Sequence, residues 1–287
     1  MILDHKGNKY YKLGLHIHTT RSDGHRTPEE AARIYREAGY DAIALTDHWI
    51  YGREDEIEGV KILSGCEYNL GISDTVEGVM HIVGIGMTAD PCIEKGAERQ
   101  LVVDKINAVG GIAVLAHPAW SLNTVEDLEC LSGIAATEIY NSVSEAGESM
   151  RAYSDYFVDL AANKGLYPTL LAVDDTHYYT GEECRGWVMV KAESLEREAI
   201  LDAIRKGELY ASEGPDIFVE REGNKIIVDT TPCQVIGIQS STSWSKGRVL
   251  RGDGVTHFEY EIADERWLRV ECIDKDGKHG WSQIIIP

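Results

Sequence analysis

Short apolar runs alternate with amphipathic stretches over residues 12–214, and this alternation limits the chain to a small number of folds. Strands are predicted at 12–19, 41–48, 61–68, 78–87, 111–118, 136–141, 167–175 and 187–192, and helices at 27–39, 94–109, 124–132, 148–164 and 195–206. The first helix has Thr27 as its cap, Pro28 at its first position and Gly39 as its stop. Strands that alternate with helices favour parallel βαβ units, in an open sheet or a barrel.

The pattern changes after Gly214. Residues 217–230 contain a glycine turn between two alternating runs, which is a hairpin signal, and the later runs are also strand-like, without a helical period. The sequence therefore predicts two domains, an α/β domain over residues 1–214 and a small antiparallel β domain over residues 215–287.

Composition narrows the possible partners. The chain has 287 residues and a formal net charge of −20, so its surface repels nucleic-acid phosphates and anionic lipid. We expect neither a nucleic-acid polymer nor a membrane as partner, although bound metals can reverse the field locally for a small phosphorylated substrate. The six cysteines form no C-x-x-C pair, and no window reaches the ~20 apolar residues of a membrane span. We expect a cytoplasmic protein with reduced thiols.

Side chains that ligate metals recur at the ends of the predicted strands. His16 and His18 lie two residues apart in a strand, so their imidazoles share a face and suit a divalent transition metal. Each such residue alone has an ordinary structural explanation, but functional residues of α/β barrels gather at strand ends. We therefore favour a metal site. The further candidate ligands are Asp23, His48, Glu67, His81, His117, Asp175 and His177.

The order of these motifs resembles the PHP (polymerase and histidinol phosphatase) family. The residues that carry the resemblance are HIHT with Asp23, then TDH, GCE, MHIVG, LAHP and DDTH, over roughly residues 12–214. The resemblance implies a distorted (β/α)7 barrel that binds two to three divalent ions. It assigns His16, His18, Glu67 and Asp175 to the first ion, Glu67, His81 and His117 to the second, and Asp23, His48 and His177 to the third. The C-terminal part is similar to that of the CehA/McbA-like branch.

One ligand position has two candidates. The last motif reads VDDTH, where the family commonly has S-D-x-H, so Asp174 competes with Asp175. Residues two apart in a strand share a face, which favours Asp175 because it can then point the same way as His177.

The ligand set predicts a metal-dependent hydrolase of a small phosphate ester, with monoesters ahead of diesters. Two metals can supply a bridging hydroxide as nucleophile, and we expect Glu67, Asp23 and His177 to be catalytic. Mixed histidine and carboxylate ligands suit Mn, Zn or Fe better than Mg. One alternative keeps the metals but cleaves a carbamate, carboxyl ester or amide. Another is a non-catalytic metal- or ligand-binding module, which the intact set of nine ligands disfavours.

Four further residues are candidates for substrate binding. Arg21 and His25 flank Asp23, Arg185 lies in the loop after the DDTH motif, and Asn141 ends a predicted strand. The charged ones are equally compatible with solvated loops. Three aromatic residues fit either a pocket wall or the core, namely Trp120, Tyr178 and Tyr179.

Overall fold

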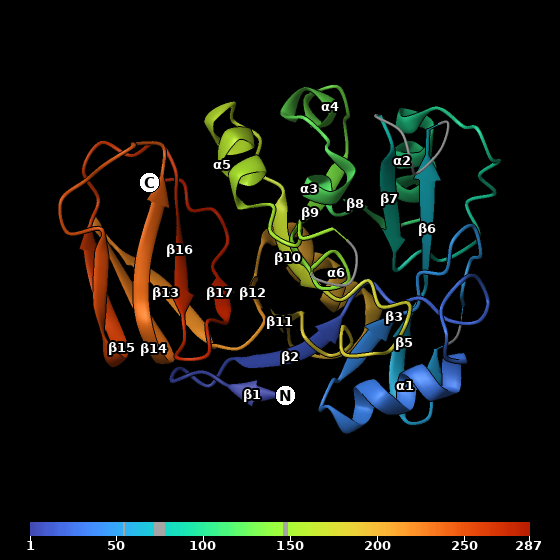
Figure 1. Ribbon diagram of the computed structural model, residues 1–287, viewed down its shortest axis with the longest axis horizontal. Helices are drawn as coiled ribbons and strands as arrows, with labels where there is room; N and C mark the ends of the chain where they lie inside the picture. The colour runs from blue at the N-terminus through green and yellow to red at the C-terminus, as the bar shows by residue number, and fades with distance from the viewer. Residues whose placement is uncertain (54, 72–77, 146–148) are drawn as a thin grey trace.

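The computed structural model describes residues 1–53, 55–71, 78–145 and 149–287, and its strands form two sheets (Figure 1). The larger sheet has twelve strands and the smaller has five. The strands of residues 217–281, orange to red in Figure 1, lie at one end of the molecule, away from α1 (Pro28–Glu37). The mixed α/β class predicted from the sequence is confirmed.

The larger sheet spans both predicted domains. Its order is β13 (Ile217–Glu222), β14 (Lys225–Ser240), β16 (Leu268–Ile273), β17 (His279–Trp281), β12 (Leu209–Ser212), β11 (Trp187–Lys191), β2 (Lys9–Gly14), β3 (Ala42–Ala44), β5 (Val60–Leu63) and β4 (Glu56–Ile57). In addition, β1 (Ile2–Leu3) pairs with β2, and β15 (Val249–Glu261) pairs with β14. The pairs β2–β3 and β3–β5 are parallel.

The smaller sheet has the order β10 (Thr169–Val173), β9 (Ile134–Asn141), β8 (Ile112–Leu115), β7 (Met80–Ile85) and β6 (Gly65–Leu70). Its pairs β8–β9 and β9–β10 are parallel, but β7 runs antiparallel to both β6 and β8. The expectation of parallel units throughout is therefore wrong at β7. For the pair β6–β7 the reason is that the joining segment is short, and parallel neighbours need a longer crossover; the segment that joins β7 to β8 contains α2 and is not limited in this way.

The described helices are α1 (Pro28–Glu37), α2 (Arg99–Ala108), α3 (Pro118–Ser121), α4 (Val125–Glu129), α5 (Asp155–Asn163) and α6 (Arg197–Lys206). The start predicted for α1 is confirmed, because Thr27 and Glu30 form a capping box and Pro28 opens the helix. Helix α6 buries Ile200 and Ile204 in a core cluster that also contains residues of both sheets, such as Leu13 and Val114. This shared core holds the two sheets together.

The described strands do not form one closed barrel by hydrogen bonding. The two sheets meet at isolated bridges between Ile17 and Thr176 and between His48 and Glu67. The strand predicted over residues 61–68 is divided at Ser64, because β5 pairs with β3 in one sheet and β6 pairs with β7 in the other. Gly65 permits this crossing, since a Cβ there would lie 2.4 Å from the Leu45 carbonyl oxygen.

The predicted domain boundary at residue 214 falls between β12 and β13. Strands β13 to β17 pair antiparallel among themselves, and β17 also pairs antiparallel with β12, so the larger sheet continues across the boundary. The division of the chain into two domains stays a prediction. No helix in the described part of the chain is long and apolar enough to cross a bilayer.

A buried ion network joins α5 to β16 and β17. Arg269 is 1% exposed and donates to both carboxylate oxygens of Asp159, at 2.8 and 3.3 Å, and to Glu271 at 2.9 Å. Asp155 lies 3.6 Å from the same guanidinium, and His279 Nδ1 is 2.7 Å from Glu271 Oε1. These five residues are called the Arg269 network below.

Candidate metal centre

All nine predicted ligands come together in the structure. They form three overlapping groups, in each of which the candidate ligand atoms lie within 4.8 Å of one another. Two residues belong to two groups each, namely His18 and Glu67. The groups are His16, His18, Glu67 and Asp175; Glu67, His81 and His117; and His18, Asp23, His48 and His177.

Glu67 lies at the centre of the cluster. It projects from β6, is 1% exposed, and directs one carboxylate oxygen toward each of two ligand groups. Its Oε1 is 2.8 Å from His81 Nδ1 and 3.3 Å from His117 Nε2. Its Oε2 is 3.0 Å from His18 Nε2 and 3.2 Å from His16 Nε2. A carboxylate placed in this way can bridge two metal ions.

His16 and His18 lie just beyond a strand and not within one. Strand β2 ends at Gly14, earlier than predicted, and the following residues interlock with the segment after β10. The His18 amide donates to the Thr176 carbonyl at 3.0 Å, and the Asp175 amide donates to the His16 carbonyl at 2.9 Å. The two imidazoles still converge as expected, with their Nε2 atoms 3.2 Å apart.

Two ligand positions have strained backbones. Asp175 has φ of 53° and His117 has φ of 26°, in a region that residues other than glycine seldom adopt. Each follows the end of a strand, β10 and β8 respectively. Such conformations cost about 1–3 kcal/mol each and gather at functional sites, so they support a functional role for this cluster.

The electrostatics of the cluster fit metal ions. Burial acts to raise the pKa of the Glu67 carboxyl, but the imidazoles around it lower that pKa well below its usual range. Burial acts to lower the pKa of His16, but the carboxylates of Asp175 and Glu67 raise it well above its usual range. Among the described residues the buried atoms Asp175 Oδ1 and His48 Nδ1 form no hydrogen bond of suitable angle, although they lie 3.0 Å from His16 Nε2 and 3.3 Å from Glu67 Oε2 respectively. Buried imidazoles and carboxylates of this kind suit divalent cations as ligands. Binding of such a cation displaces protons from its ligands.

The carboxylate of Glu138 hydrogen-bonds to two of the candidate ligands, His16 and His117. Its Oε1 lies 2.7 Å from His16 Nδ1, which leaves Nε2 of that ring for the cluster. Its Oε2 accepts from the His117 amide at 2.8 Å. Carboxylates that bond to the second nitrogen of a ligating histidine fix the ring orientation and raise its basicity.

Asn141 ends β9 and contacts the candidate ligand cluster. Its Nδ2 donates to Glu138 at 2.8 Å and to Asp175 at 3.1 Å, while its Oδ1 accepts from the amide and hydroxyl of Ser144. Because these bonds use the whole amide, the structure favours a role in positioning Asp175 over the predicted contact with substrate.

The third group is the most open. The Asp23 side chain is 54% exposed, with Oδ1 3.4 Å from His18 Nδ1 and 3.6 Å from His177 Nε2. Its Oδ2 is 3.7 Å from His48 Nε2. These distances leave room for an ion between the side chains.

Asp47 holds the loop that carries Asp23, and sequence analysis did not identify it. Its carboxylate accepts from the Thr19 amide at 2.7 Å, the Thr19 hydroxyl at 2.8 Å and the Ser22 hydroxyl at 2.9 Å. Its place directly before His48, in the TDH motif, is the signal that could have found it.

Asp174 and Asp175 differ in the groups that their carboxylates contact. Asp174 accepts from the Tyr35 hydroxyl at 2.6 Å and from the backbone amides of Cys184, Arg185 and Gly186. Burial raises its pKa to about 6, against the effect of these hydrogen bonds. Asp174 anchors a loop, whereas Asp175 faces the ligand cluster.

A cavity of about 260 Å³ lies over the cluster. The described residues that line it are Asp23, His48, Glu67, His81, His117, Asp175, His177, Trp120, Val143, Ser144 and Tyr178. Arg21, His25 and Arg185 are not among them: His25 is exposed, and Arg185 pairs with Glu145. Their predicted contact with substrate stays a prediction.

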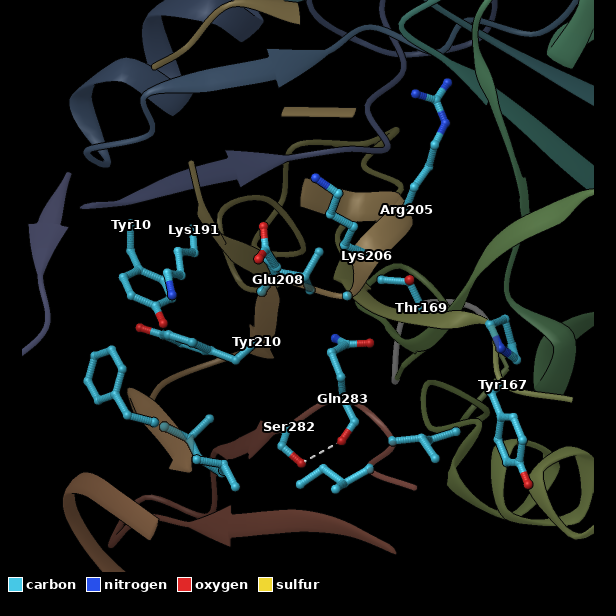
Figure 2. Close-up of a pocket in the computed structure, with 18 residues that line it drawn as sticks. Tyr10, Tyr167, Thr169, Lys191, Arg205, Lys206, Glu208, Tyr210, Ser282 and Gln283 are labelled. Carbon is cyan, nitrogen blue, oxygen red and sulfur yellow. Dashed lines mark hydrogen bonds between the residues drawn. The ribbon is translucent and has the colours of Figure 1, made fainter. Parts of the chain in front are cut away.

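A different cavity, of about 490 Å³, lies between the end of α6, the start of β10 and the C-terminal residues (Figure 2). Its floor includes Gln283, whose side-chain amide pairs with both backbone groups of Leu170. Figure 2 shows Arg205 and Lys206 directed away from Tyr210 and Gln283. No predicted ligand lines this cavity, so the smaller one defines the candidate site.

Comparisons with known proteins agree with this geometry at the level of fold. No protein-family model matches the chain. A relative in sequence is the uncharacterized protein MJ1587 of Methanocaldococcus jannaschii, which is 29% identical in an alignment 124 residues long; the match covers 37% of this chain and 67% of that protein. The lesion-specific endonuclease PfuEndoQ of Pyrococcus furiosus is more distant, at 15% identity and a TM-score of 0.46, over 70% of this chain and 56% of that one.

A structure from Bacteroides vulgatus matches nearly the whole molecule. It is a two-domain protein containing a predicted PHP-like metal-dependent phosphoesterase, and it is 14% identical to this chain, with a TM-score of 0.54. The match covers 99% of this chain and 98% of that one. The chain therefore has the fold of this PHP-like protein, as the order of its histidine and carboxylate motifs predicted.

Proposed function

We propose that the protein is a metal-dependent hydrolase of small phosphate esters. The observation that carries this proposal is the position of Glu67, which directs one oxygen toward each of two groups of buried ligands. The PHP-like fold supports it, because the Bacteroides vulgatus protein with that fold contains a predicted metal-dependent phosphoesterase. The metals themselves, the nine ligands and the catalytic roles of Glu67, Asp23 and His177 are parts of the proposal.

Divalent ions in such a site lower the pKa of a water and neutralise the charge that develops on phosphoryl oxygens. The contribution of the chain is to place the ligands. The carboxylate of Glu67 sets the separation of the first two groups, and Asn141 and Glu138 hold Asp175 and His16 in their orientations.

His177 and Asp23 lie at the open side of the cluster. The Nδ1 of His177 is 2.7 Å from the Asp175 carbonyl oxygen, so that nitrogen carries a proton and donates it. In the neutral ring Nε2 is then unprotonated, and it faces Asp23 at 3.6 Å. These two side chains are placed to hold the third ion or to exchange a proton at the cavity.

The size of the cavity and the net charge of the chain favour a small substrate. A cavity of about 260 Å³ accommodates a small ester, and the net charge of −20 opposes binding of a polynucleotide. The monoester preference and the cytoplasmic location remain expectations from the sequence.

The first test is the metal content. Elemental analysis of the purified, loaded protein should find two to three equivalents of transition metal per chain, and His81→Ala should remove about one of them. His257→Ala is the matched control, because His257 is half-exposed on β15, pairs with Asp229 and belongs to no ligand group. A content of one equivalent or less after loading would contradict the proposed set of ligands.

The second test is a substrate panel. The Mn-loaded protein should hydrolyse a model phosphate monoester, and a diester more slowly. Turnover of carboxyl esters or amides without turnover of phosphate esters would favour the alternative hydrolase. Tight metal binding without any turnover would favour a binding module.

A further inference from the structure

The walls of the cavity over the ligands are aromatic and apolar. Apart from the candidate ligands, the described lining residues are Trp120, Val143, Ser144 and Tyr178. No lysine or arginine lines this cavity within the described part of the chain. The positive charge that meets a substrate there must therefore come from the metals.

Trp120 is built into the wall beside the second ligand group. Its ring lies 4.9 Å from the His117 ring and 5.5 Å from the His81 ring, measured between centroids. It belongs to α3, which begins directly after His117, and Ser121 of the same helix bonds to His117 Nδ1 at 3.0 Å. The Ala119 amide also donates to the Ser154 hydroxyl at 3.2 Å. These contacts hold the short helix that carries the indole.

The charge distribution limits the organic part of a substrate. A phosphoryl group over the ligands would be neutralised by the metals, but a second anionic group farther out would face Trp120 and Val143 without a cationic partner. Burying an unpaired charge is costly. The volume beside the indole fits a single ring. A cavity of about 150 Å³ holds benzene, so a cavity of about 260 Å³ that also receives a phosphoryl group matches about one ring.

We propose that Trp120 determines specificity, and that the site accepts phosphate esters of a small, flat, uncharged organic group that packs against the indole. This inference rests on the proposed hydrolase function. Trp120 is preferred to Tyr178 as the main contact, because the Tyr178 side chain is 41% exposed and Trp120 is partly buried.

Binding of phosphonates tests this inference without a chemical step. Calorimetry with the Mn-loaded protein should show that phenylphosphonate binds about 10-fold more tightly than methylphosphonate, a difference typical of added apolar contact in a pocket. A phenylphosphonate with a carboxylate on its ring should bind more weakly than phenylphosphonate. Trp120→Ala should remove most of the preference for phenyl over methyl, and Trp120→Phe should retain most of it.

The controls separate substrate contact from support of the ligands. Trp244→Ala is the matched control, because Trp244 is 75% exposed and lies in the loop before β15. Trp120→Ala should leave the metal content and the affinity for methylphosphonate unchanged; loss of metal, or equal loss of both phosphonates, would overturn the inference. It would also be overturned if the wild-type protein did not prefer phenylphosphonate. A Trp120-dependent preference in a protein that hydrolyses no phosphate ester would support the binding site and contradict the proposed function.

Discussion

Two regions of the molecule bury clusters of charged side chains. The negative charge of the carboxylates is balanced in a different way in each region. In the Arg269 network the guanidinium donates to Asp159 and Glu271 and lies beside Asp155, so the chain supplies its own cation. Around Glu67 the described residues give buried carboxylates imidazole neighbours but no ion pair with lysine or arginine.

Hydrogen bonding also differs between the two regions. In the candidate ligand cluster Asp175 accepts from Asn141 through Oδ2, but its Oδ1 has no hydrogen-bond partner among the described residues. In the Arg269 network each carboxylate accepts a hydrogen bond from an arginine or tryptophan side chain. Buried charges must be paired or bind metals. The comparison indicates that the network at α5 is a completed structural contact, and it supports the proposal that the cluster at Glu67 binds a cation from outside the chain.

The largest effect is expected from Glu67→Gln, which tests the cluster of candidate metal ligands around Glu67. Glutamine keeps the size of the side chain but loses its charge and one anionic oxygen. We expect loss of at least one metal and a fall in kcat/KM for a phosphate ester of at least ~10³-fold, about 4 kcal/mol of transition-state stabilisation. Turnover at a fixed metal concentration, with thermal melts to confirm folding, measures it.

The matched control is Glu213→Gln. Glu213 is also buried, at 5% exposed, but belongs to none of the ligand groups. Its substitution should leave the metal content unchanged. Near wild-type turnover by folded Glu67→Gln would mean that Glu67 is not the shared ligand.

Arg269→Met tests the Arg269 network and should lower the stability of the protein without affecting metal binding. It removes the cation from three carboxylates, so the free energy of unfolding should fall by about 3 kcal/mol, in the range for breaking a buried ion pair. Denaturant unfolding measures the change, and elemental analysis should find the wild-type metal content. Arg266→Met is the control, because Arg266 is exposed and bonds to Asn163 at 3.4 Å. A loss of metal in folded Arg269→Met would show that the two clusters depend on each other.

The smallest effect concerns pH at the edge of the Arg269 network. Burial acts to lower the pKa of His279, but its hydrogen bond to Glu271 and the nearby carboxylates raise it. A raised pKa in the folded state means that the stabilisation is present below the unfolded value near 6.5 and is lost as pH rises through the folded value. The difference in unfolding free energy between wild type and His279→Asn should therefore shrink between pH 6 and pH 9. A difference that grows over this range would be the opposite of the expected sign.

Local patterns in the sequence were sufficient for much of the site. The i, i+2 spacing predicted that His16 and His18 lie together, and the order of the motifs predicted the other side chains that form the cluster. The start of α1 was also readable, because capping by Thr27 depends on residues within one turn.

Contacts between distant residues account for what the sequence did not predict. The support of His16 by Glu138 and of Asp175 by Asn141 joins residues 122 and 34 positions apart. The division of residues 61–68 between two sheets depends on which strands lie beside β5 and β6, and an apolar run contains no information about its neighbours. For the same reason the antiparallel direction of β7 could not be read from MHIVG.

The crossing of the chain at Ser64 and Gly65 has a mechanical consequence. His16, His18 and His48 follow strands of the larger sheet, whereas Glu67, His81, His117 and Asp175 lie on or just after strands of the smaller one. In the proposed metal-bound protein, an ion held by both sets would link the two sheets, which the described chain otherwise joins through isolated bridges and a shared core. Removal of the ion should then make separation of the sheets easier.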